Sequence, residues 1–305
     1  MDKFKFTVFT PTYNRGNTLH RVYKSLVNQS FRDFEWLIID DGSSDNTGEV
    51  VNEFIRTANF SIRYLFQDNK HKFHTILEAV KIAKGDFFYI IDSDDEIFPN
   101  ALELLYKYWV SIPINDRHFF SGVTGLCVDQ HMKLIGTKFP SDIFDSDTLE
   151  SSVKYGIKGE KSGFQRTDLM REFSFNEGFF NNGYIPEGLF WVGLANKGYK
   201  TRYFNEYIRK YYVDAGESIM TTAKFVPNAY GTHQYTLLFI NSYKGYYLRN
   251  LRQIIGQIRN FTVSGWILGY SSLSLLNKAK YLIIKILFII TLPISFFYFY
   301  YVKKE

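Results

Sequence analysis

Two hydrophobic patterns alternate along the first hundred residues of the chain. Short, continuously apolar runs are typical of strands buried on both faces, and apolar residues that recur every three or four positions are typical of amphipathic helices. Strands are predicted over residues 5–10, 34–40, 62–66 and 87–91, with a helix in each interval between them. Gly85 is predicted to end the third helix as a left-handed cap. The alternation predicts an α/β fold, in which helices cover both faces of a mostly parallel sheet.

The pattern loosens after the fourth predicted strand. A helix is predicted after Pro99, a further strand over residues 119–129, and mainly helices over residues 225–280. The helical stretch is moderately basic and leads into a strongly apolar tail. We therefore expect two domains, an α/β domain over residues 1–215 and a helical appendage over residues 216–305.

The tail is the most hydrophobic part of the chain. Every residue from Ile286 to Val302 is apolar, a small hydroxyl residue or proline, and lysines flank the run on both sides. The run is slightly shorter than the ~20 residues that a membrane-spanning helix needs, and Pro293 lies in its middle. We expect residues 281–302 to associate with a membrane, either as a span or as an interfacial or re-entrant anchor.

Polar side chains follow three of the predicted strands. Asp40 and Asp41 end the second strand, and Asp92, Asp94 and Asp95 follow the fourth. The first strand runs into the turn sequence PTYNR. Because the carboxyl ends of parallel strands meet at one edge of a sheet, where ligands bind in such folds, we expect these groups to lie together.

The three acids that follow the fourth strand suggest a cation site. Carboxylates this close repel one another, and they are stable together only if they protonate, accept several hydrogen bonds or bind a cation. Hard oxygen ligands suit Mg²⁺ or Mn²⁺, which usually complete their coordination with water and substrate phosphates. The sequence DSDD therefore indicates a metal–diphosphate site, and a solvated turn with capping aspartates before Pro99 is the alternative.

Composition excludes some classes of protein. The net charge of +5 comes without a dense basic stripe interleaved with aromatic residues, so we expect no nucleic-acid partner. A single cysteine, Cys127, excludes an intrachain disulfide framework and a cysteine-rich metal site, and it is consistent with a reducing compartment. The N-terminal sequence MDKFKFTVFT does not have the pattern of a signal peptide.

Three separated motifs resemble those of the family 2 glycosyltransferases, which have the GT-A fold with its Rossmann-like sheet. They are TPTYNR (10–15), WLIIDDGSSDNT (36–47) and AKGDFFYIIDSDDE (83–96), and they occur in the order expected for the family. The resemblance covers roughly the first hundred residues well and the next hundred more weakly. It implies transfer of a sugar from a nucleotide-diphosphate donor with inversion at the anomeric carbon.

The resemblance implies a nucleotide-binding role for the first two motifs. Matched position by position, Pro11, Tyr13 and Arg15 would line the nucleotide site at the end of the first strand. Asp41, with Asp40 beside it, would accept a hydrogen bond from the edge of the base, most often uracil. The nucleotide-sugar donor is therefore expected to be a UDP-sugar.

The third motif implies the metal and diphosphate contacts. Asp92 would lie near the ribose, Asp94 would ligate the Mn²⁺ or Mg²⁺ ion that bridges both phosphates, and Asp95 would support that shell. Lys72 and His74 match a basic stretch that many relatives carry, and they would face phosphates or sugar hydroxyls. For His74, a position at the protein surface or at a helix start is an equally good interpretation.

The catalytic base is harder to assign. Many relatives carry it in a Glu-Asp pair, which this chain lacks, but GYIPEGLFW (183–191) resembles the matching segment of a bacterial subgroup. Glu187 would take the proton from the attacking hydroxyl. The alternative is that Glu187 only provides favourable charge at a helix N-terminus. Asp214 and Glu177 are the reserve candidates for the base.

Together these observations predict a metal-dependent, inverting glycosyltransferase that acts on a lipid-linked or cell-surface glycan acceptor. The Gln-Xaa-Xaa-Arg-Trp signature of processive synthases is absent, so non-processive transfer is expected. The tail is expected to hold the protein at the inner membrane surface, on the cytoplasmic face, as a peripheral or tail-anchored protein. A non-catalytic nucleotide-sugar-binding sensor or membrane scaffold is the alternative. A nucleotidyltransferase is disfavoured because TPTYNRGNT contains only one glycine.

Overall fold

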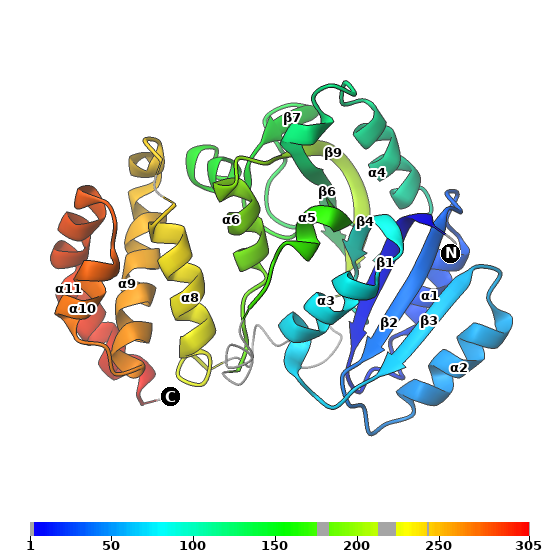
Figure 1. Cartoon of the computed structure of the whole chain (residues 1–305), viewed down its shortest axis with the longest axis horizontal. Helices are drawn as coiled ribbons and strands as arrows, with labels where there is room; N and C mark the ends of the chain where they lie inside the picture. Colours follow the sequence, from blue (N-terminus) through cyan, green and yellow to red (C-terminus); the bar gives the residue numbers. More distant parts are fainter. Residues whose placement is uncertain (1–2, 176–182, 213–223, 243, 305) are drawn as a thin grey trace. The chain divides into compact units, whose positions relative to one another are not determined.

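The computed structural model describes residues 3–175, 183–212, 224–242 and 244–304 (Figure 1). The chain folds into two compact units, each built from separate stretches of sequence. Unit 1 comprises residues 1–147, 157–175 and 198–216, and unit 2 comprises residues 148–156, 176–197 and 217–305. Unit 2 therefore takes two segments from within the predicted first domain.

Unit 1 is built on one mixed β-sheet. Its strands are β1 (Phe4–Thr12), β2 (Phe34–Asp40), β3 (Ser61–Phe66), β4 (Gly85–Ile90), β5 (Glu96–Ile97), β6 (Phe120–Asp129), β7 (Ile143–Ser146), β8 (Lys161–Arg166) and β9 (Lys200–Tyr211). Their order is β3-β2-β1-β4-β8-β6-β9-β5, and β7 pairs with β9. The first four strands are mutually parallel, as predicted, whereas β8 runs antiparallel to both of its neighbours.

Helices cover both faces of this sheet (Figure 1). They are α1 (His20–Val27), α2 (Thr47–Thr57), α3 (His71–Ile82), α4 (Ala101–Val110), α5 (Thr167–Arg171) and the short η1 (Arg117–Phe119). On one face, α1, α2 and α4 share a core with the β1 side chains Phe6 and Val8. Helices α3 and α5 contact each other and the sheet on the opposite face. The predicted α/β architecture is confirmed.

Gly85 is a correction to the sequence analysis. It does not cap α3 but begins β4, where it pairs with Phe4 of β1, and the helix ends at Ile82. A β-carbon at this position would lie 2.2 Å from the backbone nitrogen of Thr7. Glycine is therefore required by the close approach of the two strands and not by a left-handed backbone conformation.

Unit 2 is helical in the residues that the structure describes. Its elements are η2 (Glu150–Lys154), α6 (Gly188–Asn196), α8 (Ala229–Ile240), η4 (Tyr247–Asn250), α9 (Leu251–Ile267), α10 (Ser272–Lys278) and α11 (Leu282–Val302). Helix α9 lies centrally and packs against α8 and α11 (Figure 1). Its buried side chains Ile254, Ile258 and Phe261 share a core with Phe239 of α8 and Phe288 of α11.

The predicted apolar tail is the single helix α11. Pro293 lies inside it without ending it. By length and composition alone, α11 is able to cross a membrane. It also packs against α9 along one side, so only part of its apolar surface contacts the core of unit 2.

Candidate functional site

The loops that follow β1 and β2 are tied together by hydrogen bonds. Thr12 at the end of β1 pairs with Asp40 at the end of β2, so the two loops begin side by side. Asn14, with a φ of 51°, accepts from the backbone N–H of Ser44 at 2.8 Å, and its own N–H donates to Ser43 Oγ at 2.8 Å. Asparagine tolerates this left-handed conformation better than most residues. The motifs TPTYNR and DDGSSDNT thus form one connected frame.

The two aspartates at the end of β2 have different surroundings. Both carboxylates of this pair are buried, and Asp40 accepts hydrogen bonds on both oxygens, from Ser43 N–H and from Tyr64 Oη, each at 2.8 Å. Asp41 Oδ1 accepts from Gln67 Nε2 at 2.7 Å, whereas no described residue donates to its Oδ2. Of the two, Asp41 therefore has the oxygen that is available to a ligand.

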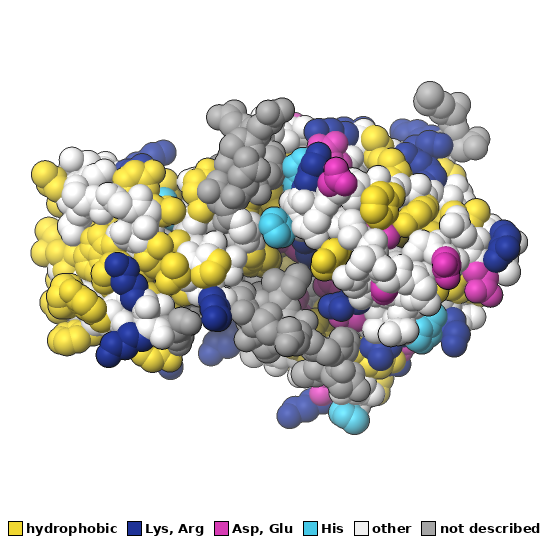
Figure 2. Space-filling view, turned by 90° about the horizontal axis from the view of Figure 1, so that it is seen from below, with side chains coloured by type: hydrophobic (Ala, Val, Ile, Leu, Met, Phe, Trp, Pro, Cys, Tyr) yellow, Lys and Arg dark blue, Asp and Glu magenta, His cyan; other side chains and the backbone are white. Residues whose placement is uncertain are grey.

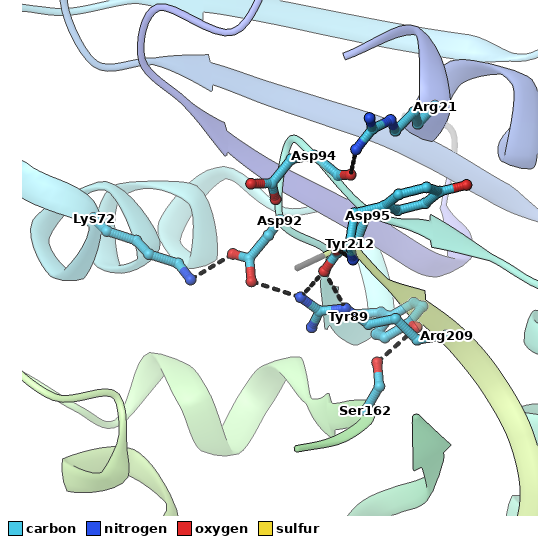
Figure 3. A network of polar contacts seen from close by, with 9 residues as sticks. All are labelled: Arg21, Lys72, Tyr89, Asp92, Asp94, Asp95, Ser162, Arg209 and Tyr212. Carbon is cyan, nitrogen blue, oxygen red and sulfur yellow. Dashed lines mark hydrogen bonds and ion pairs between the residues drawn. The ribbon is translucent and has the colours of Figure 1, made fainter. Parts of the chain in front are cut away.

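Asp92 and Asp95, which follow β4, are held by basic residues (Figure 3). Arg209 of β9 donates through Nε to Asp95 Oδ2 at 2.7 Å, and through Nη2 to Asp92 Oδ2 at 2.6 Å. Lys72 at the start of α3 donates to the other oxygen of Asp92 at 2.5 Å. Asp95 is fully buried, and the backbone N–H of Tyr212 donates to its second oxygen at 3.1 Å. Two of the three acids are therefore neutralised by protein groups.

The pKa values of these acids follow from burial and from the basic partners. Burial alone would raise the pKa of Asp92, but the charges of Lys72 and Arg209 outweigh it and hold the pKa well below its usual range. Burial raises the pKa of Asp95 to about 6, although Arg209 opposes the rise. At pH 7 both carboxylates are thus ionised, and the pKa of Arg209 is raised by the two negative charges despite its burial.

Asp94 differs from its two neighbours. Among the described residues, no side chain donates a hydrogen bond to its carboxylate, and Figure 3 shows the group apart from the Arg209 contacts. Burial and the negative charge of Asp92 raise its pKa above the usual value. Its backbone carbonyl accepts from Arg21 Nη1 at 3.0 Å, which fixes the loop but leaves the carboxylate oxygens available. Of the three acids, Asp94 is therefore the one whose ionised carboxylate an added cation would stabilise most.

The residues at this edge fit a divalent cation that is shared with a ligand. Within the part of the chain that the structure describes, no group of three or more His, Cys, Asp or Glu side chains is arranged to hold a metal ion alone. Mg²⁺ and Mn²⁺ are commonly held by one or two carboxylates when phosphates supply further oxygens. Here Asp94 offers one available carboxylate, and the paired carboxylate of Asp92 lies beside it. The fit is to a metal–diphosphate complex and not to a metal that the protein binds alone.

Two arginines complete this region and were missed in the sequence analysis. Arg209 lies on β9, and Arg21 lies on α1, where the first helix was predicted. The Arg21 guanidinium stacks over the Tyr212 ring at 3.9 Å, next to the Asp95 contact. A charge that is buried in a protein needs a partner. However, β9 also carries Arg202, Glu206 and Lys210, so no signal in the sequence singled out Arg209 as a buried charge.

The other predicted nucleotide-site residues have mixed surroundings. Pro11 is buried within β1, where it pairs with Ile39, whereas half of the Tyr13 side chain is exposed. The charge of Arg15 lowers the pKa of Asp94, opposing the effect of burial, so Arg15 lies near that carboxylate. The nucleotide-binding roles of these residues remain predictions.

The basic residues of α3 differ in what they contact. Lys72 binds Asp92, as described above, and so lies at the acidic cluster. His74 Nε2 lies 3.7 Å from Glu78 Oε1 on the same helix, and burial lowers the pKa of His74, so the ring is neutral at pH 7. A phosphate-binding role for either residue remains a prediction.

Glu187 lies in unit 2, immediately before α6. The helix that follows is strongly apolar, with Leu189, Phe190 and Val192 buried. This position also supports the alternative role of a favourable charge at the helix N-terminus. The reserve candidates Asp214 and Glu177 lie outside the described residues.

Arg209 is expected to be essential for the stability of unit 1. Removing one partner of a buried ion pair leaves the other charge without compensation, which costs about 3–5 kcal/mol. We therefore expect Arg209→Met to lower the free energy of unfolding by about that amount, measured by urea denaturation. Adding Asp95→Asn, which removes the isolated charge, should restore much of the loss.

Arg202→Met is the matched control for this prediction. Arg202 lies on the same strand and makes a two-pronged ion pair with Asp145, whose side chain is 30% exposed. Because water can solvate Asp145 when its partner is removed, the loss should be clearly smaller. Equal losses for the two variants, or no recovery on adding Asp95→Asn, would contradict this account of Arg209.

The fold and the site together define a class of protein. A Rossmann-like set of parallel strands carries an acidic cluster at its carboxyl ends and continues into a mixed sheet, which is the architecture of a GT-A domain. Residues 7–115 match the family profile described as Glycosyl transferase family 2. Residues 7–115 thus form a segment similar to the family 2 glycosyltransferases, a family of transferase enzymes.

A curated relative resembles most of the chain. The GalNAc(5)-diNAcBac-PP-undecaprenol beta-1,3-glucosyltransferase of Campylobacter jejuni is 27% identical over 231 residues, which cover 74% of this chain and 70% of the relative. The chain spans less than half the length of several other curated glycosyltransferases that it matches.

Two solved structures share the fold. Staphylococcus aureus TarS 1–349 in complex with UDP-GlcNAc has a TM-score of 0.58 at 19% identity, covering 95% of this chain and 80% of that one. The mannosyltransferase PcManGT from Pyrobaculum calidifontis, in complex with GDP-Man and Mn²⁺, has a TM-score of 0.56 at 17% identity, covering 96% and 81%. At these identities the likeness concerns the fold alone.

Proposed function

We propose that this chain is an inverting, metal-dependent glycosyltransferase that transfers one sugar per binding event from a UDP-sugar to a lipid-linked or cell-surface glycan. The observation that carries the proposal is the distribution of charge in the acidic cluster. Asp92 and Asp95 are neutralised by Arg209 and Lys72, whereas the Asp94 carboxylate accepts no hydrogen bond from a described side chain. A carboxylate in this state suits a divalent cation shared with a diphosphate.

The nucleotide would be recognised mainly through Asp41. Its Oδ1 is engaged by Gln67, and its Oδ2 can accept the N3–H of uracil. Asp40 would act indirectly, because burial and the Asp40 charge raise the pKa of Tyr64 and keep its hydroxyl as a hydrogen-bond donor to Asp40. This arrangement supports a role for Asp40 in holding the loop that carries Asp41.

The reaction also requires stabilisation of the diphosphate as it leaves the sugar. When the sugar leaves, negative charge grows on a phosphate oxygen, and a divalent cation supplies electrostatic stabilisation where that charge develops. Asp94 would hold this cation, with Asp92 beside it. Arg209 and Lys72 would keep Asp92 and Asp95 in place, so that the cation is not needed to hold the loop together.

The acceptor must lose a proton as it reacts. Its hydroxyl oxygen bonds to the anomeric carbon while the bond from that carbon to the diphosphate oxygen breaks, which inverts the configuration. Glu187 is proposed to take the hydroxyl proton as the general base.

The acceptor is proposed to lie at a membrane. The Campylobacter relative carries an undecaprenol-linked acceptor in its name, and α11 of this chain is apolar enough to associate with lipid. These two observations support action on a lipid-linked acceptor. The cytoplasmic face of the inner membrane is part of the proposal.

Thermal unfolding with added nucleotides tests the donor assignment. We expect UDP and UDP-sugars with Mn²⁺ to raise the Tm, since a ligand at a hundred times its Kd stabilises the folded state by about 2.7 kcal/mol. GDP with Mn²⁺ and UDP without metal should give smaller shifts. Equal shifts for UDP and GDP would contradict the assignment of uracil as the preferred nucleobase. The absence of any shift would contradict the assignment of the donor site.

Asp41→Asn sharpens this test. The asparagine oxygen can keep the bond to Gln67, but its NH₂ group would face the uracil N3–H, placing donor against donor. Loss of a hydrogen bond to a charged group is worth about 1.5–3 kcal/mol, so UDP affinity should fall by about 10–100-fold. The midpoint of urea unfolding provides the control for stability. Unchanged UDP affinity would contradict the role of Asp41.

A further inference from the structure

Helix α11 has two distinct faces. The buried side chains Ile284, Phe288, Thr291, Ser295 and Val302 recur at intervals of three, four and seven residues, so they form one side of the helix. This side packs onto α9 within the core of unit 2. The inner face is thus already occupied by protein, and it includes two hydroxyl side chains.

The opposite face of α11 is exposed and almost entirely apolar. We call it the outer face; its exposed side chains are Leu282, Ile286, Ile289, Ile290, Ile294, Phe296, Phe297, Tyr300 and Tyr301. Phe297 is 76% exposed and Leu282 is 74% exposed. A continuous exposed apolar strip of this kind usually marks an interaction surface.

The charges of this part of the chain favour an anionic partner. Residues 224–305 contain ten basic side chains and one acidic side chain, Glu305. The basic residues are Lys224, Lys244, Arg249, Arg252, Arg259, Lys278, Lys280, Lys285, Lys303 and Lys304. Figure 2 shows hydrophobic side chains at the left of the molecule, with lysines and arginines among them. Anionic lipid surfaces attract such basic residues when they flank an apolar surface.

The C-terminal end of α11 has a composition typical of the membrane interface. Its aromatic residues include Tyr298, and the Arg259 guanidinium of α9 stacks over that ring at 4.0 Å. Trp266 of α9 lies edge-on to Phe299, with ring centroids 5.7 Å apart. Tyrosine, tryptophan and arginine gather at the boundary between lipid and water, because their apolar bodies and polar ends suit both phases.

A spanning arrangement of α11 conflicts with its packing. To cross a bilayer alone, the helix would have to leave α9 and expose Ile254, Ile258 and Phe261 to water. To cross together with α9, it would carry Arg252 and Arg259 into the hydrocarbon, which is unfavourable for charged side chains. A helix lying in the plane of the interface avoids both costs.

We propose that unit 2 binds the surface of an anionic lipid bilayer through the outer face of α11, with the helix lying in the membrane plane and both of its ends on one side. This inference deepens the membrane association included in the proposed function. Its tests measure lipid binding and helix topology, and neither needs sugar transfer.

Vesicle flotation of the full chain tests the lipid surface. We expect binding to phosphatidylglycerol-rich vesicles to exceed binding to phosphatidylcholine vesicles by on the order of tenfold, and to weaken as salt is raised. The double variant Ile290→Asp/Phe297→Asp should bind phosphatidylglycerol-rich vesicles about tenfold more weakly than the wild type, because it removes apolar area and adds two negative charges. If the wild-type chain binds neither kind of vesicle, the proposal is overturned.

The control is a matched pair of substitutions in unit 1. Ile114 and Phe119 are 76% and 54% exposed, so Ile114→Asp/Phe119→Asp makes the same chemical change at comparable exposure. We expect this variant to float with vesicles almost as well as the wild type. Equal losses in the two double variants would overturn the assignment of the outer face. A stable dimer in solution that only the α11 substitutions dissociate, without vesicle binding, would assign the face to a second copy and overturn the proposal.

Labelling of the two helix ends separates the in-plane arrangement from a span. The native Cys127 is buried and should give little background. Lys280→Cys and Lys304→Cys, expressed in a bacterial host, can be treated with a membrane-impermeant maleimide in spheroplasts and in inverted membrane vesicles. We expect both positions to react from the same side. Reaction from opposite sides would show a span and overturn the proposal. UDP-dependent stabilisation would be unaffected, so failure here is distinguishable from failure of the proposed function.

Discussion

Replacing Asp94 by asparagine should lower the rate of sugar transfer by about 10²–10³-fold and weaken its dependence on Mn²⁺. The charge stabilisation that a bound cation supplies is worth several kcal/mol, and each 1.36 kcal/mol corresponds to tenfold in rate. The fold should survive, because no described side chain is hydrogen-bonded to the Asp94 carboxylate. Since burial and Asp92 raise the pKa of Asp94, removing its charge should not destabilise the protein.

This experiment measures initial transfer rates across a range of Mn²⁺ concentrations, together with Mn²⁺ affinity in the presence of UDP. Asp142→Asn is a suitable control, because Asp142 is an exposed acid of unit 1 before β7. It should transfer sugar at the wild-type rate. An Asp94→Asn enzyme that retained both wild-type turnover and wild-type metal dependence would refute the metal assignment and the proposed function that rests on it.

Glu187→Gln should abolish most of the transfer while sparing donor binding. A general base typically contributes 10²–10⁴-fold, and glutamine has nearly the same shape but cannot accept the proton at neutral pH. We therefore expect kcat to fall by about that factor. The UDP-dependent rise in Tm should match the wild-type rise, because the substitution removes a proton acceptor and not a nucleotide contact.

Glu206→Gln provides the comparison for the base. Glu206 is an acid of β9 that accepts a hydrogen bond from Tyr108 Oη at 2.7 Å, and a glutamine oxygen can accept the same bond. Its transfer rate should stay close to the wild-type rate. Normal transfer by Glu187→Gln would exclude Glu187 as the base. A wild-type protein that binds UDP-sugars but transfers none would favour a nucleotide-sugar sensor instead.

The acidic cluster shows what a local sequence pattern can predict about a site and what it cannot. The position of Asp92, Asp94 and Asp95 after a buried strand predicted their place at the sheet edge, and the acids were predicted to need protonation, several hydrogen bonds or a cation to be stable together. The compensation comes largely from Arg209, which lies more than a hundred positions away in the sequence. Spacing within a motif carries no information about such a partner, because only the pairing of distant strands brings it close.

Gly85 shows the same limit of local sequence reasoning, here for a position in the backbone. A glycine after a helical pattern has two explanations, a left-handed cap or a close approach, and the local pattern favoured the cap. The structure requires the second, because β1 runs against β4 at this position. The choice depended on which strand lies beside Gly85, and this is a property of the sheet order.

The amino-acid sequence alone determined the alternation of strands and helices, the parallel first half of the sheet and the apolar character of α11, because periodicity of hydrophobic residues is a local property. Tertiary structure decided which carboxylate is neutralised, which remains available and which face of α11 is covered. Those outcomes depend on burial and on partners supplied from elsewhere in the chain, so they appear only when the distant segments have packed.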